Sequence, residues 1–277
     1  MQSTNSVALV DESQRETFRN WGVIRLNQLL PAKKVTRACK AVWSRMERAE
    51  IWRDGTWCVD HLRHARVNEG AKFARRIKGC PEVNDLVKDE VPRVVAQLLD
   101  GQPTFTGMDV PQPLFTLPNA DSWSVPHNVW HLDVPRLPDC GTPGVQVFTF
   151  LGTVAATGGA TLVVAGSHRL LNGSNRISSK NVKRKLKNEP YFRDLMSEGT
   201  ADRYRFVQEV GHCGDVELQV VELVGDPGDV YFMDLRVLHA PAPNVTQVPR
   251  IMLTRRFFRE ALRDLIYGDT QDKSVSR

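Results

Sequence analysis

The sequence has no long apolar run: nowhere do eighteen apolar residues follow one another, and residues 1–18 have no basic stretch ahead of an apolar one. A membrane-spanning helix needs about twenty predominantly apolar residues, and a secretion signal needs both a basic and an apolar part. Neither pattern is present. We therefore expect a cytoplasmic protein with no membrane partner.

Cysteine is also scarce. The chain of 277 residues has five cysteines, an odd number with no CxxC spacing. A disulfide framework or a zinc knuckle needs cysteines at short, regular intervals, so we expect reduced, unpaired thiols at Cys39, Cys58, Cys80, Cys140 and Cys213. Hydrophobic residues make up 41% and charged residues 25% of the chain, which is ordinary for a globular protein. We expect one domain over residues 1–277.

A strong excess of one charge is absent as well. The net charge is +5, and basic residues gather in one run at Lys180, Lys183, Arg184, Lys185 and Lys187. Such a run is most often a solvated surface segment, although it can also attract an anionic ligand. No aromatic residues are interleaved with the run, as they are in many nucleic-acid-binding segments. We therefore expect no nucleic-acid partner.

Two amphipathic helices are predicted in an N-terminal helical part, about residues 1–105. Apolar residues recur at steps of three and four over residues 31–47, with Pro31 suited to the first turn. The same pattern predicts a second helix over residues 82–99, despite Pro92. Both helices are expected to pack on the outside of a sheet.

Short strand-like runs separated by glycine and proline fill the chain after about residue 110. They cover residues 145–151, 160–164, 216–224, 230–232 and 251–257. This density predicts an antiparallel barrel or sandwich, with its core over about residues 106–262. Residues 167–206 are polar and basic, with a short helix expected at 191–196. Insertions of this length are often functional lids, so we expect a lid over about residues 170–206.

His131 and Asp133 are the first candidates for a metal site. In a strand, residues i and i+2 project from the same face, so an imidazole nitrogen and a carboxylate oxygen could reach one metal ion. His239 follows a turn and an apolar strand and offers a third ligand. Two histidines and one carboxylate leave three positions of an octahedron open, which suits ferrous iron that binds a co-substrate and dioxygen together.

Arg250 lies eleven residues after His239 and leads an apolar strand. A guanidinium stays charged in an apolar cavity and pairs bidentately with carboxylates. Arg250 is therefore suited to hold the far carboxylate of a keto-diacid. An HxD pattern alone occurs by chance in many chains, but the added histidine and the arginine at this spacing favour an iron site.

Other conspicuous residues have structural interpretations. His168, beside a turn, is expected to form a structural hydrogen bond. Trp130 should point away from the metal face and into the core. The sequon at residues 244–246 is expected to shape a turn. The histidines without a partner at metal spacing are His61, His64, His127 and His212.

Three segments resemble the phytanoyl-CoA dioxygenase-like family of oxygenases: WHLD at 130–133, GGATLVVAGSHR at 158–169 and GDVYFMDLRVLHAPAPNVTQVPR at 228–250. Residues 18–35 resemble the family's first strand and helix. The resemblance implies a mainly β fold with helices, a double-stranded β-helix (jelly-roll or cupin-like) barrel with flanking N-terminal helices. It also implies Fe(II) as cofactor, with 2-oxoglutarate and O2 as co-substrates.

Carried over residue by residue, the resemblance makes His131, Asp133 and His239 the catalytic Fe(II) ligands and Arg250 the anchor for a 2-oxoglutarate carboxylate. Thr149 is a candidate for a further contact with the co-substrate. The family commonly has an Asn-Gly pair, a proline, a tryptophan and a serine where this chain has Gly158-Gly159, Ala165, Phe148 and Pro241. None of these departures removes a metal ligand, but the finer contacts with 2-oxoglutarate stay open.

The activity that the resemblance implies is hydroxylation of an unactivated C–H bond of a small-molecule substrate, with release of succinate and CO2. Related halogenases have a small residue in place of the aspartate, so Asp133 favours hydroxylation or another outcome of hydrogen abstraction. The sequence leaves open the substrate, the oligomeric state, and the choice between hydroxylation and desaturation, epoxidation or ring formation. If the substrate is anionic, Lys183, Arg184 and Lys185 are candidates to bind it.

Two other functions stay open at this point. A non-catalytic barrel would bind metal and 2-oxoglutarate as a sensor or scaffold and would never release succinate. A cupin-type metalloenzyme independent of 2-oxoglutarate would keep its activity after Arg250→Ala. The oxygenase is favoured because a buried arginine would be costly without its acid partner.

Overall fold

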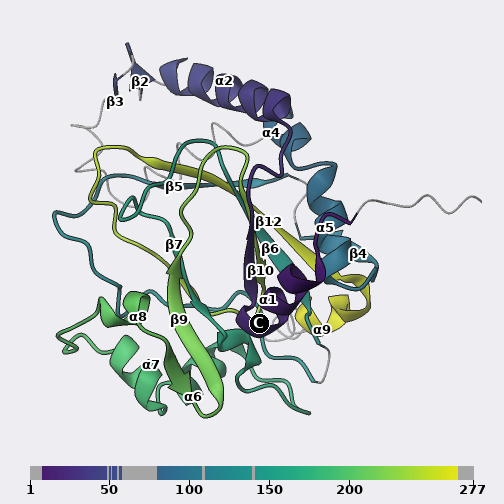
Figure 1. Ribbon diagram of the computed structural model, residues 1–277, viewed down its shortest axis with the longest axis vertical. Helices are drawn as coiled ribbons and strands as arrows, with labels where there is room; N and C mark the ends of the chain where they lie inside the picture. The colour runs from purple at the N-terminus through teal and green to yellow at the C-terminus, as the bar shows by residue number, and fades with distance from the viewer. Residues whose placement is uncertain are drawn as a thin grey trace, which may run out of the picture.

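Two antiparallel sheets form the centre of the computed structural model, which describes residues 8–48, 50, 52–54, 56–57, 80–107, 110–138 and 141–267 (Figure 1). The larger sheet has the order β1-β10-β6-β12-β4, with β5 also paired to β12, and the smaller has the order β11-β7-β9-β8. The larger sheet consists of β1 (Val23–Leu26), β4 (Thr104–Thr106), β5 (Gln112–Thr116), β6 (Gly144–Phe150), β10 (Val230–Asp234) and β12 (Arg250–Arg259). The smaller consists of β7 (Thr161–Ala165), β8 (Gly211–Cys213), β9 (Val216–Glu222) and β11 (His239–Pro241).

This arrangement confirms the expected double-stranded β-helix. The five predicted strands are all present, and their ends differ from the prediction by at most two residues. A separate short hairpin pairs β2 (Trp52–Arg53) with β3 (Thr56–Trp57).

Alternation along the strands sorts the buried side chains into an inner and an outer layer. Phe148 and Phe150 of β6 pack with Val163 of β7, so these side chains lie between the two sheets. Val145 and Val147 of the same strand pack instead against helices on the outer face of the larger sheet. Because both faces are covered, β6 is buried along its whole length.

Helices of the N-terminal part cover that outer face. The elements are α1 (Glu12–Trp21), α2 (Ala32–Arg48), α4 (Pro81–Leu86) and α5 (Glu90–Leu98). Val42 and Val94 are fully buried against the sheet. Asp11 caps α1 through a capping box with Gln14, an arrangement that satisfies two otherwise unpaired backbone N–H groups. The helix predicted over 31–47 is thus confirmed, as α2.

The helix predicted over residues 82–99 is wrong as a single element. The structure divides it into α4 and α5, with the break at residues 87–89. Pro92 has no N–H to donate, and its ring would clash with the carbonyl four residues earlier, that of Lys88. The chain therefore restarts the helix at Glu90, which places Pro92 in the first turn of α5, where no such bond is required.

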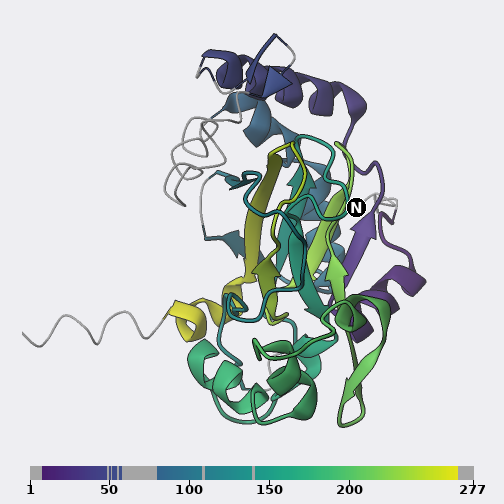
Figure 2. The same cartoon turned by 90° about the vertical axis from the view of Figure 1, so that its left-hand side faces the viewer.

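The insertion at about 170–206 forms helices on the outer face of the smaller sheet. They are α6 (Ser179–Leu186), α7 (Pro190–Leu195) and the start of α8 (Arg205–Gln208), and they lie beside β9, at the opposite end from α2 (Figures 1 and 2). Leu186 and Phe192 pack with Leu162 of β7, which points away from the inner layer. These helices form a layer packed behind the smaller sheet, and the lid over about residues 170–206 stays a prediction. The helix expected at 191–196 is α7.

Among the described residues, the remaining helical elements are η2 (Ser167–Arg169), η3 (Glu260–Leu262) and α9 (Arg263–Tyr267). No helix in the described part of the chain is long and apolar enough to cross a membrane. Cys39, Cys80 and Cys213 are free thiols, as expected. Cys58 and Cys140, like His61 and His64, lie outside the described residues.

Candidate metal centre and co-substrate site

Backbone pairing brings His131 and His239 side by side. The N–H of His131 donates to the carbonyl of His239 at 2.9 Å, and the N–H of His239 donates to the carbonyl of His131 at 3.0 Å. The two residues therefore form an isolated antiparallel bridge, with their ring centroids 4.2 Å apart. Paired residues of an antiparallel bridge project from the same face, so the sheet itself fixes the spacing of these two imidazoles.

Asp133 joins the two histidines from two residues further along the first segment. Its Oδ2 lies 3.5 Å from Nε2 of His239, and one ligand atom from each of the three residues lies within 4.8 Å of the others. The intervening Leu132 points the other way, into the layer behind the smaller sheet. The strand alternation that the sequence predicted is therefore present, and the three side chains form one potential metal centre.

Both histidines present the same ring nitrogen to the centre. Nδ1 of His131 lies 3.1 Å from the carbonyl of Val129, and Nδ1 of His239 lies 3.0 Å from the carbonyl of Val237. A carbonyl can only accept, so each Nδ1 carries the proton and each Nε2 keeps its lone pair free. Metal-binding histidines usually have this second hydrogen bond, which fixes the ring orientation.

The environment keeps His239 neutral. Burial lowers its pKa to about 4, the nearby Asp133 carboxylate opposes this shift, and His131 adds to it. At neutral pH the ring therefore offers a lone pair rather than a second proton, as metal coordination requires. His131 is exposed and Asp133 half-buried, so the centre is open to solvent on the side of His131.

Arg256 is a contact of this centre that the sequence did not predict. Its Nε and Nη2 both donate to Oδ2 of Asp133, at 3.0 and 2.8 Å. Arg256 lies on β12, six residues after Arg250, so strand alternation places both arginines on the inner face. That parity is the one signal in the sequence that could have indicated the contact.

Arg250 lies in the inner layer without a counter-charge. Its side chain is 5% exposed, and Nη1 donates to Oγ1 of Thr161 at 3.0 Å. Nε has no hydrogen-bond partner, and within the described ranges no carboxylate pairs with the guanidinium. Burial lowers its pKa to about 10, so it remains charged at neutral pH. A buried cation with an unpaired donor is the environment expected where an acid binds.

Arg250 and the metal centre face each other along β7. Thr161, which holds the guanidinium, pairs with Pro241, and His239 pairs with Val163. Two residues of a strand span about 7 Å. A short diacid bound at the metal centre by one end could therefore reach Arg250 with the other.

The expected contact of Thr149 with the co-substrate is wrong. In β6 it pairs with Leu253 and Val230, which lie in the outer layer, whereas Arg250 has the parity of Met252 and lies in the inner layer. Thr149 is 1% exposed and donates instead to the carbonyl of Asp229 at 3.3 Å. Its neighbours Phe148 and Phe150 face the inner layer in its place.

The structural interpretations of the other residues are confirmed. Nε2 of His168 lies 3.0 Å from the carbonyl of Arg19, and Trp130 is 1% exposed and donates to the carbonyl of Pro126 at 2.7 Å. Asn244 is fully buried and accepts from the N–H and the hydroxyl of Thr246, which shapes a turn. No further cluster with the spacing of a metal site occurs in the part of the chain that the structure describes.

The predicted basic run lies on the solvent side of α6. Arg184, Lys185 and Lys187 are exposed, whereas Val182 and Leu186 of the same helix pack inward. The helix covers the outer face of the smaller sheet, away from the candidate metal ligands on the inner face. This arrangement matches the solvated surface segment that the sequence favoured and gives no support to a role in binding an anionic substrate.

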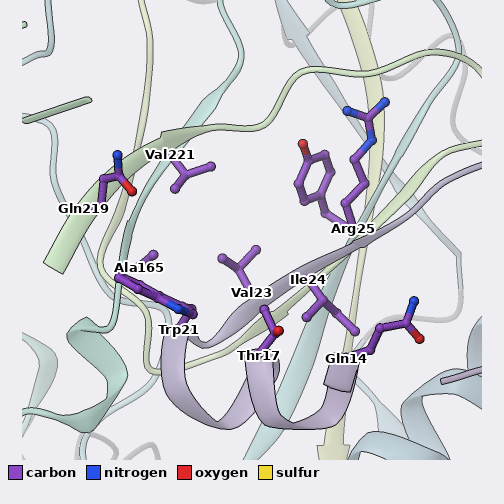
Figure 3. A pocket seen from close by; sticks show the side chains of 10 residues that line it. Gln14, Thr17, Trp21, Val23, Ile24, Arg25, Ala165, Gln219 and Val221 are labelled. Carbon is purple, nitrogen blue, oxygen red and sulfur yellow. The ribbon is translucent and has the colours of Figure 1, made fainter. Parts of the chain in front are cut away.

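A cavity of about 290 Å³ lies apart from the metal centre, between α1, β1 and the strands β7, β9 and β10. Trp21, Val23 and Val221 line its apolar walls, with Arg25 and Gln219 at the polar positions (Figure 3). None of the three candidate ligands lines this cavity. It is therefore no part of the metal centre or of the Arg250 site.

Comparison with known proteins agrees with this geometry. The sequence profile of the family described as Phytanoyl-CoA dioxygenase (PhyH) matches residues 18–252. No curated protein matches the chain.

Solved structures share the fold at low sequence identity. SnoK, a non-heme α-ketoglutarate-dependent carbocyclase from nogalamycin biosynthesis, has a TM-score of 0.55 and 18% identity, covering 96% of this chain and 91% of its own. EctD from S. alaskensis in its apo form has a TM-score of 0.54 and 16% identity, covering 93% and 79%. AviO1 from Streptomyces viridochromogenes Tue57 has a TM-score of 0.52 and 17% identity, covering 92% and 98%.

The family profile covers the smaller sheet, the larger sheet up to the start of β12, and the segments that carry all three candidate ligands and Arg250. The donor set of two imidazoles and one carboxylate fits ferrous iron, and the unpaired guanidinium fits a dicarboxylate. The chain therefore belongs to the phytanoyl-CoA dioxygenase (PhyH) family and is an oxygenase that uses non-haem iron and 2-oxoglutarate.

Proposed function

We propose that the protein hydroxylates an unactivated C–H bond of a small-molecule substrate, with His131, Asp133 and His239 as the iron ligands and Arg250 as the anchor for 2-oxoglutarate. Two proteins of the same fold support a small-molecule substrate. EctD has been solved with 2-oxoglutarate and 5-hydroxyectoine, and SnoK takes part in nogalamycin biosynthesis. The intact Asp133 supports hydroxylation rather than halogenation.

The observation that carries this proposal is the position of Arg250 relative to the three ligands. The ligand atoms lie within 4.8 Å of one another, and the guanidinium is buried about two strand residues away with an unpaired Nε. A 2-oxoglutarate-independent cupin would have no need of such a charge, since burying it without a partner costs free energy. A scaffold that binds 2-oxoglutarate would need it as well, so succinate release is what separates that alternative from the oxygenase.

Each residue of the site has a defined role in this proposal. Bound iron and 2-oxoglutarate would together activate O2 and release succinate and CO2. His131 and His239 present Nε2, because their Nδ1 protons are held by backbone carbonyls. Arg250 fixes the direction of the co-substrate through its far carboxylate. Phe148 and Phe150 exclude water from the inner layer on the side of Arg250.

The binding test uses anaerobic protein with ferrous iron and 2-oxoglutarate. We expect a weak visible charge-transfer band in the wild type that is lost in Asp133→Ala and weakened in Arg250→Ala. His212→Ala is the matched control, because this histidine is exposed on β8, away from the centre. A well-folded, iron-loaded wild type without the band would contradict the proposal.

The catalytic test is a substrate screen scored by succinate release, followed by mass analysis of the product. Hydroxylation adds one oxygen atom to the substrate, whereas ring formation removes two hydrogen atoms. Succinate released only with iron and 2-oxoglutarate present supports the oxygenase. Activity that survives Arg250→Ala unchanged would support the cupin-type enzyme, and binding without any succinate would support the scaffold.

A further inference from the structure

Arg256 uses only part of its guanidinium on Asp133. Nε donates to Oδ2 of this carboxylate at 3.0 Å, and Nη2 lies 2.8 Å from the same oxygen, so one side of the planar group is occupied. A guanidinium has five N–H donors in a fixed fork. Nη1 and the second N–H of Nη2 donate to no residue that the structure describes. With its side chain 30% exposed, Arg256 can bind a second acid through this free end.

The strand β12 carries both arginines of the site but holds them far apart. Arg250 and Arg256 point to the inner layer, because residues an even number apart on a strand share one face. Six residues of a strand span about 20 Å, so Arg250 lies at one end of the site with Thr161 and Arg256 at the other with Asp133. If 2-oxoglutarate pairs with Arg250, the end at Arg256 is left for another group.

A buried acceptor without a partner lies beside Arg256. Gln146 of β6 pairs with Arg256 of β12, and residues paired in this way have their Cβ atoms about 5 Å apart on the same face. Gln146 is 2% exposed; its Nε2 donates to Oγ1 of Thr254 at 3.0 Å, and its Oε1 has no hydrogen-bond partner among the described residues. An unsatisfied buried acceptor costs free energy, and an N–H or O–H group of a ligand would satisfy it.

The inner face of β6 and β12 changes from apolar to polar toward Arg256. Phe150 of β6 pairs with Met252 of β12, and both pack in the apolar inner layer. Further along the same strands, Gln146 and Thr254 bring an amide and a hydroxyl to this face. Polar groups in a buried layer cost free energy unless they are paired, so their place beside an arginine with free donors indicates a site for a polar ligand.

The charges of the site indicate which ligand fits this end. With metal and co-substrate bound, the divalent ion and Arg250 balance the charges of Asp133 and of the two carboxylates of 2-oxoglutarate, while metal-binding imidazoles are neutral. The positive charge of Arg256 is then left over. One carboxylate would balance it, whereas a phosphate monoester carries about two negative charges. The planar fork also matches the geometry of a carboxylate.

We propose that Arg256 and Gln146 bind the substrate, and that the substrate is a small carboxylic acid with an N–H or O–H group next to its carboxylate. Arg256 pairs with the carboxylate through Nη1 and Nη2, and Oε1 of Gln146 accepts from the neighbouring N–H or O–H group. This inference rests on the proposed function, because it takes the site to hold the metal ion and 2-oxoglutarate. It adds the class of substrate.

The test uses anaerobic protein loaded with Mn(II) and saturated with 2-oxoglutarate, and three small probes of nearly the same shape. N-acetylglycine has a carboxylate and an N–H group, N-acetylglycinamide lacks the charge, and 4-oxopentanoate lacks the N–H group. Mn(II) shortens the NMR relaxation times of probe protons close to it, so a titration gives each dissociation constant and places the probe at the metal centre. We expect the wild type to bind N-acetylglycine about tenfold more tightly than N-acetylglycinamide and roughly threefold more tightly than 4-oxopentanoate.

Two substitutions separate the two contacts. Arg256→Met should weaken the binding of N-acetylglycine by about tenfold and leave that of N-acetylglycinamide unchanged, because only the acid pairs with the guanidinium. Gln146→Met should remove the preference for N-acetylglycine over 4-oxopentanoate and keep the preference over the amide. Arg256→Lys keeps the charge but not the planar fork, so we expect it to bind N-acetylglycine with intermediate affinity.

Arg25→Met is the matched control. Arg25 is 34% exposed and donates to a buried aspartate, Asp229, at 2.6 Å, yet it lies on β1, away from the metal centre. We expect this variant to lose stability while the affinities for all three probes stay within about twofold of the wild type. Circular dichroism checks that each variant is folded, and Arg256→Lys provides the comparison if Arg256→Met is not.

Three results would overturn the inference. If the wild type binds N-acetylglycine no more tightly than N-acetylglycinamide, this end of the site does not select an acid. If Arg256→Met lowers Mn(II) affinity but binds the probes as the wild type does, Arg256 only orients Asp133. If Gln146→Met keeps the preference for N-acetylglycine over 4-oxopentanoate, the amide does not contact the substrate.

Failure of the proposed function has a different signature. Calorimetric titration of 2-oxoglutarate into the Mn(II)-loaded wild type precedes the probe experiments. If the co-substrate does not bind, the proposed function fails and this inference fails with it. If the co-substrate binds and the acid is not preferred, the inference alone fails.

Discussion

At the scale of single residues, the site combines satisfied and unsatisfied groups. The imidazoles of His131 and His239 are oriented by carbonyls two residues earlier in their own segments. Their orientation therefore depends on the local backbone and needs no neighbouring side chain. Arg250 is the opposite case, because it is buried, its Nη1 donates to Thr161 and to the sulfur of Met252, and its Nε is unpaired. The guanidinium is thus incompletely satisfied at the position where we propose that the co-substrate binds.

This contrast makes Arg250→Met a test with two opposite effects. Replacing a buried, unpaired charge by an apolar side chain of similar length removes a desolvation cost, so we expect the free energy of unfolding of the ligand-free protein to rise by about 1 kcal/mol. The same variant should bind 2-oxoglutarate at least tenfold more weakly, because no bidentate pair can form. Urea unfolding measured with and without Mn(II) and 2-oxoglutarate checks both effects.

Arg263→Met serves as control for that experiment. Arg263 is 61% exposed, pairs with Glu260 within one turn and lies over the ring of Phe105, so its loss should lower the free energy of unfolding by less than about 1 kcal/mol and leave the affinity for 2-oxoglutarate unchanged. A ligand-free Arg250→Met protein that is markedly less stable than the wild type would show that the guanidinium is already well satisfied without an acid.

At the scale of elements, two buried arginines fasten the insertion to the metal-bearing segment. Arg203 donates to the carbonyls of Val125, Pro126, Leu195 and Ser197. Arg136, 1% exposed, donates to those of Ser167, Leu170 and Arg236. Two isolated bridges, at Arg136 with Ile177 and at Pro138 with Gly173, add backbone pairing. The insertion and the segment that carries Asp133 are therefore parts of one packed layer.

We expect Arg203→Met to lower the free energy of unfolding by about 2–4 kcal/mol, because several buried carbonyls lose their donor. Limited proteolysis should then cut within residues 170–206 sooner than in the wild type. Arg205→Met is the matched control: Arg205 pairs with Asp194, both more than a third exposed, so its loss should cost less than about 1 kcal/mol. Equal destabilisation by the two substitutions would contradict this account.

How far the sequence predicts each element depends on how many of its faces are buried. The HxD segment has one ligand face and one apolar face, so its alternation placed His131 and Asp133 together. β6 is buried on both faces, so no alternation of polar and apolar residues distinguishes its inner face from its outer face. Thr149 was therefore predicted on the inner face, although it lies on the outer one. Arg256 was missed because its partner Asp133 lies 123 residues away in the chain. A contact at that distance depends on strand register, which the sequence alone does not give.

At the scale of the whole molecule, the core has three layers. Helices α2, α4 and α5 cover the larger sheet, the inner layer joins the two sheets, and α6 and α7 cover the smaller sheet. The site lies in the inner layer. The strand residues that form its walls alternate with residues that pack against the helices on the outer faces. Asp229 links the start of β10 to β1 and the turn after it, because its carboxylate accepts hydrogen bonds from the backbone N–H groups of Asp226 and Gln28 and from the guanidinium of Arg25.

The hydrogen bonds of the Asp229 carboxylate make the stability of the protein depend on pH. Burial alone would raise the pKa of Asp229, but the two backbone N–H groups and Arg25 outweigh it and hold the pKa below its usual value. A carboxyl with a depressed folded-state pKa stabilises the protein fully above its unfolded-state pKa, and this contribution is lost as pH falls through the folded-state value. We expect the free energy of unfolding of the wild type to exceed that of Asp229→Asn by about 2–3 kcal/mol near pH 7.

The difference between the two proteins should shrink as the pH falls below about 4, the ordinary value for an aspartate. Urea unfolding at a series of pH values measures it. A difference that stays constant from neutral to acidic pH would mean that the charge of Asp229 contributes nothing.

The backbone bridge between His131 and His239 has one more consequence. It joins two segments more than a hundred residues apart, so the centre exists only in the folded chain. A metal ion that binds the folded chain alone adds a stabilisation that grows with the logarithm of its free concentration. The lifetime of this protein against cellular proteases would then follow the supply of iron, and a cell short of the metal would carry less of the enzyme without any change in its synthesis.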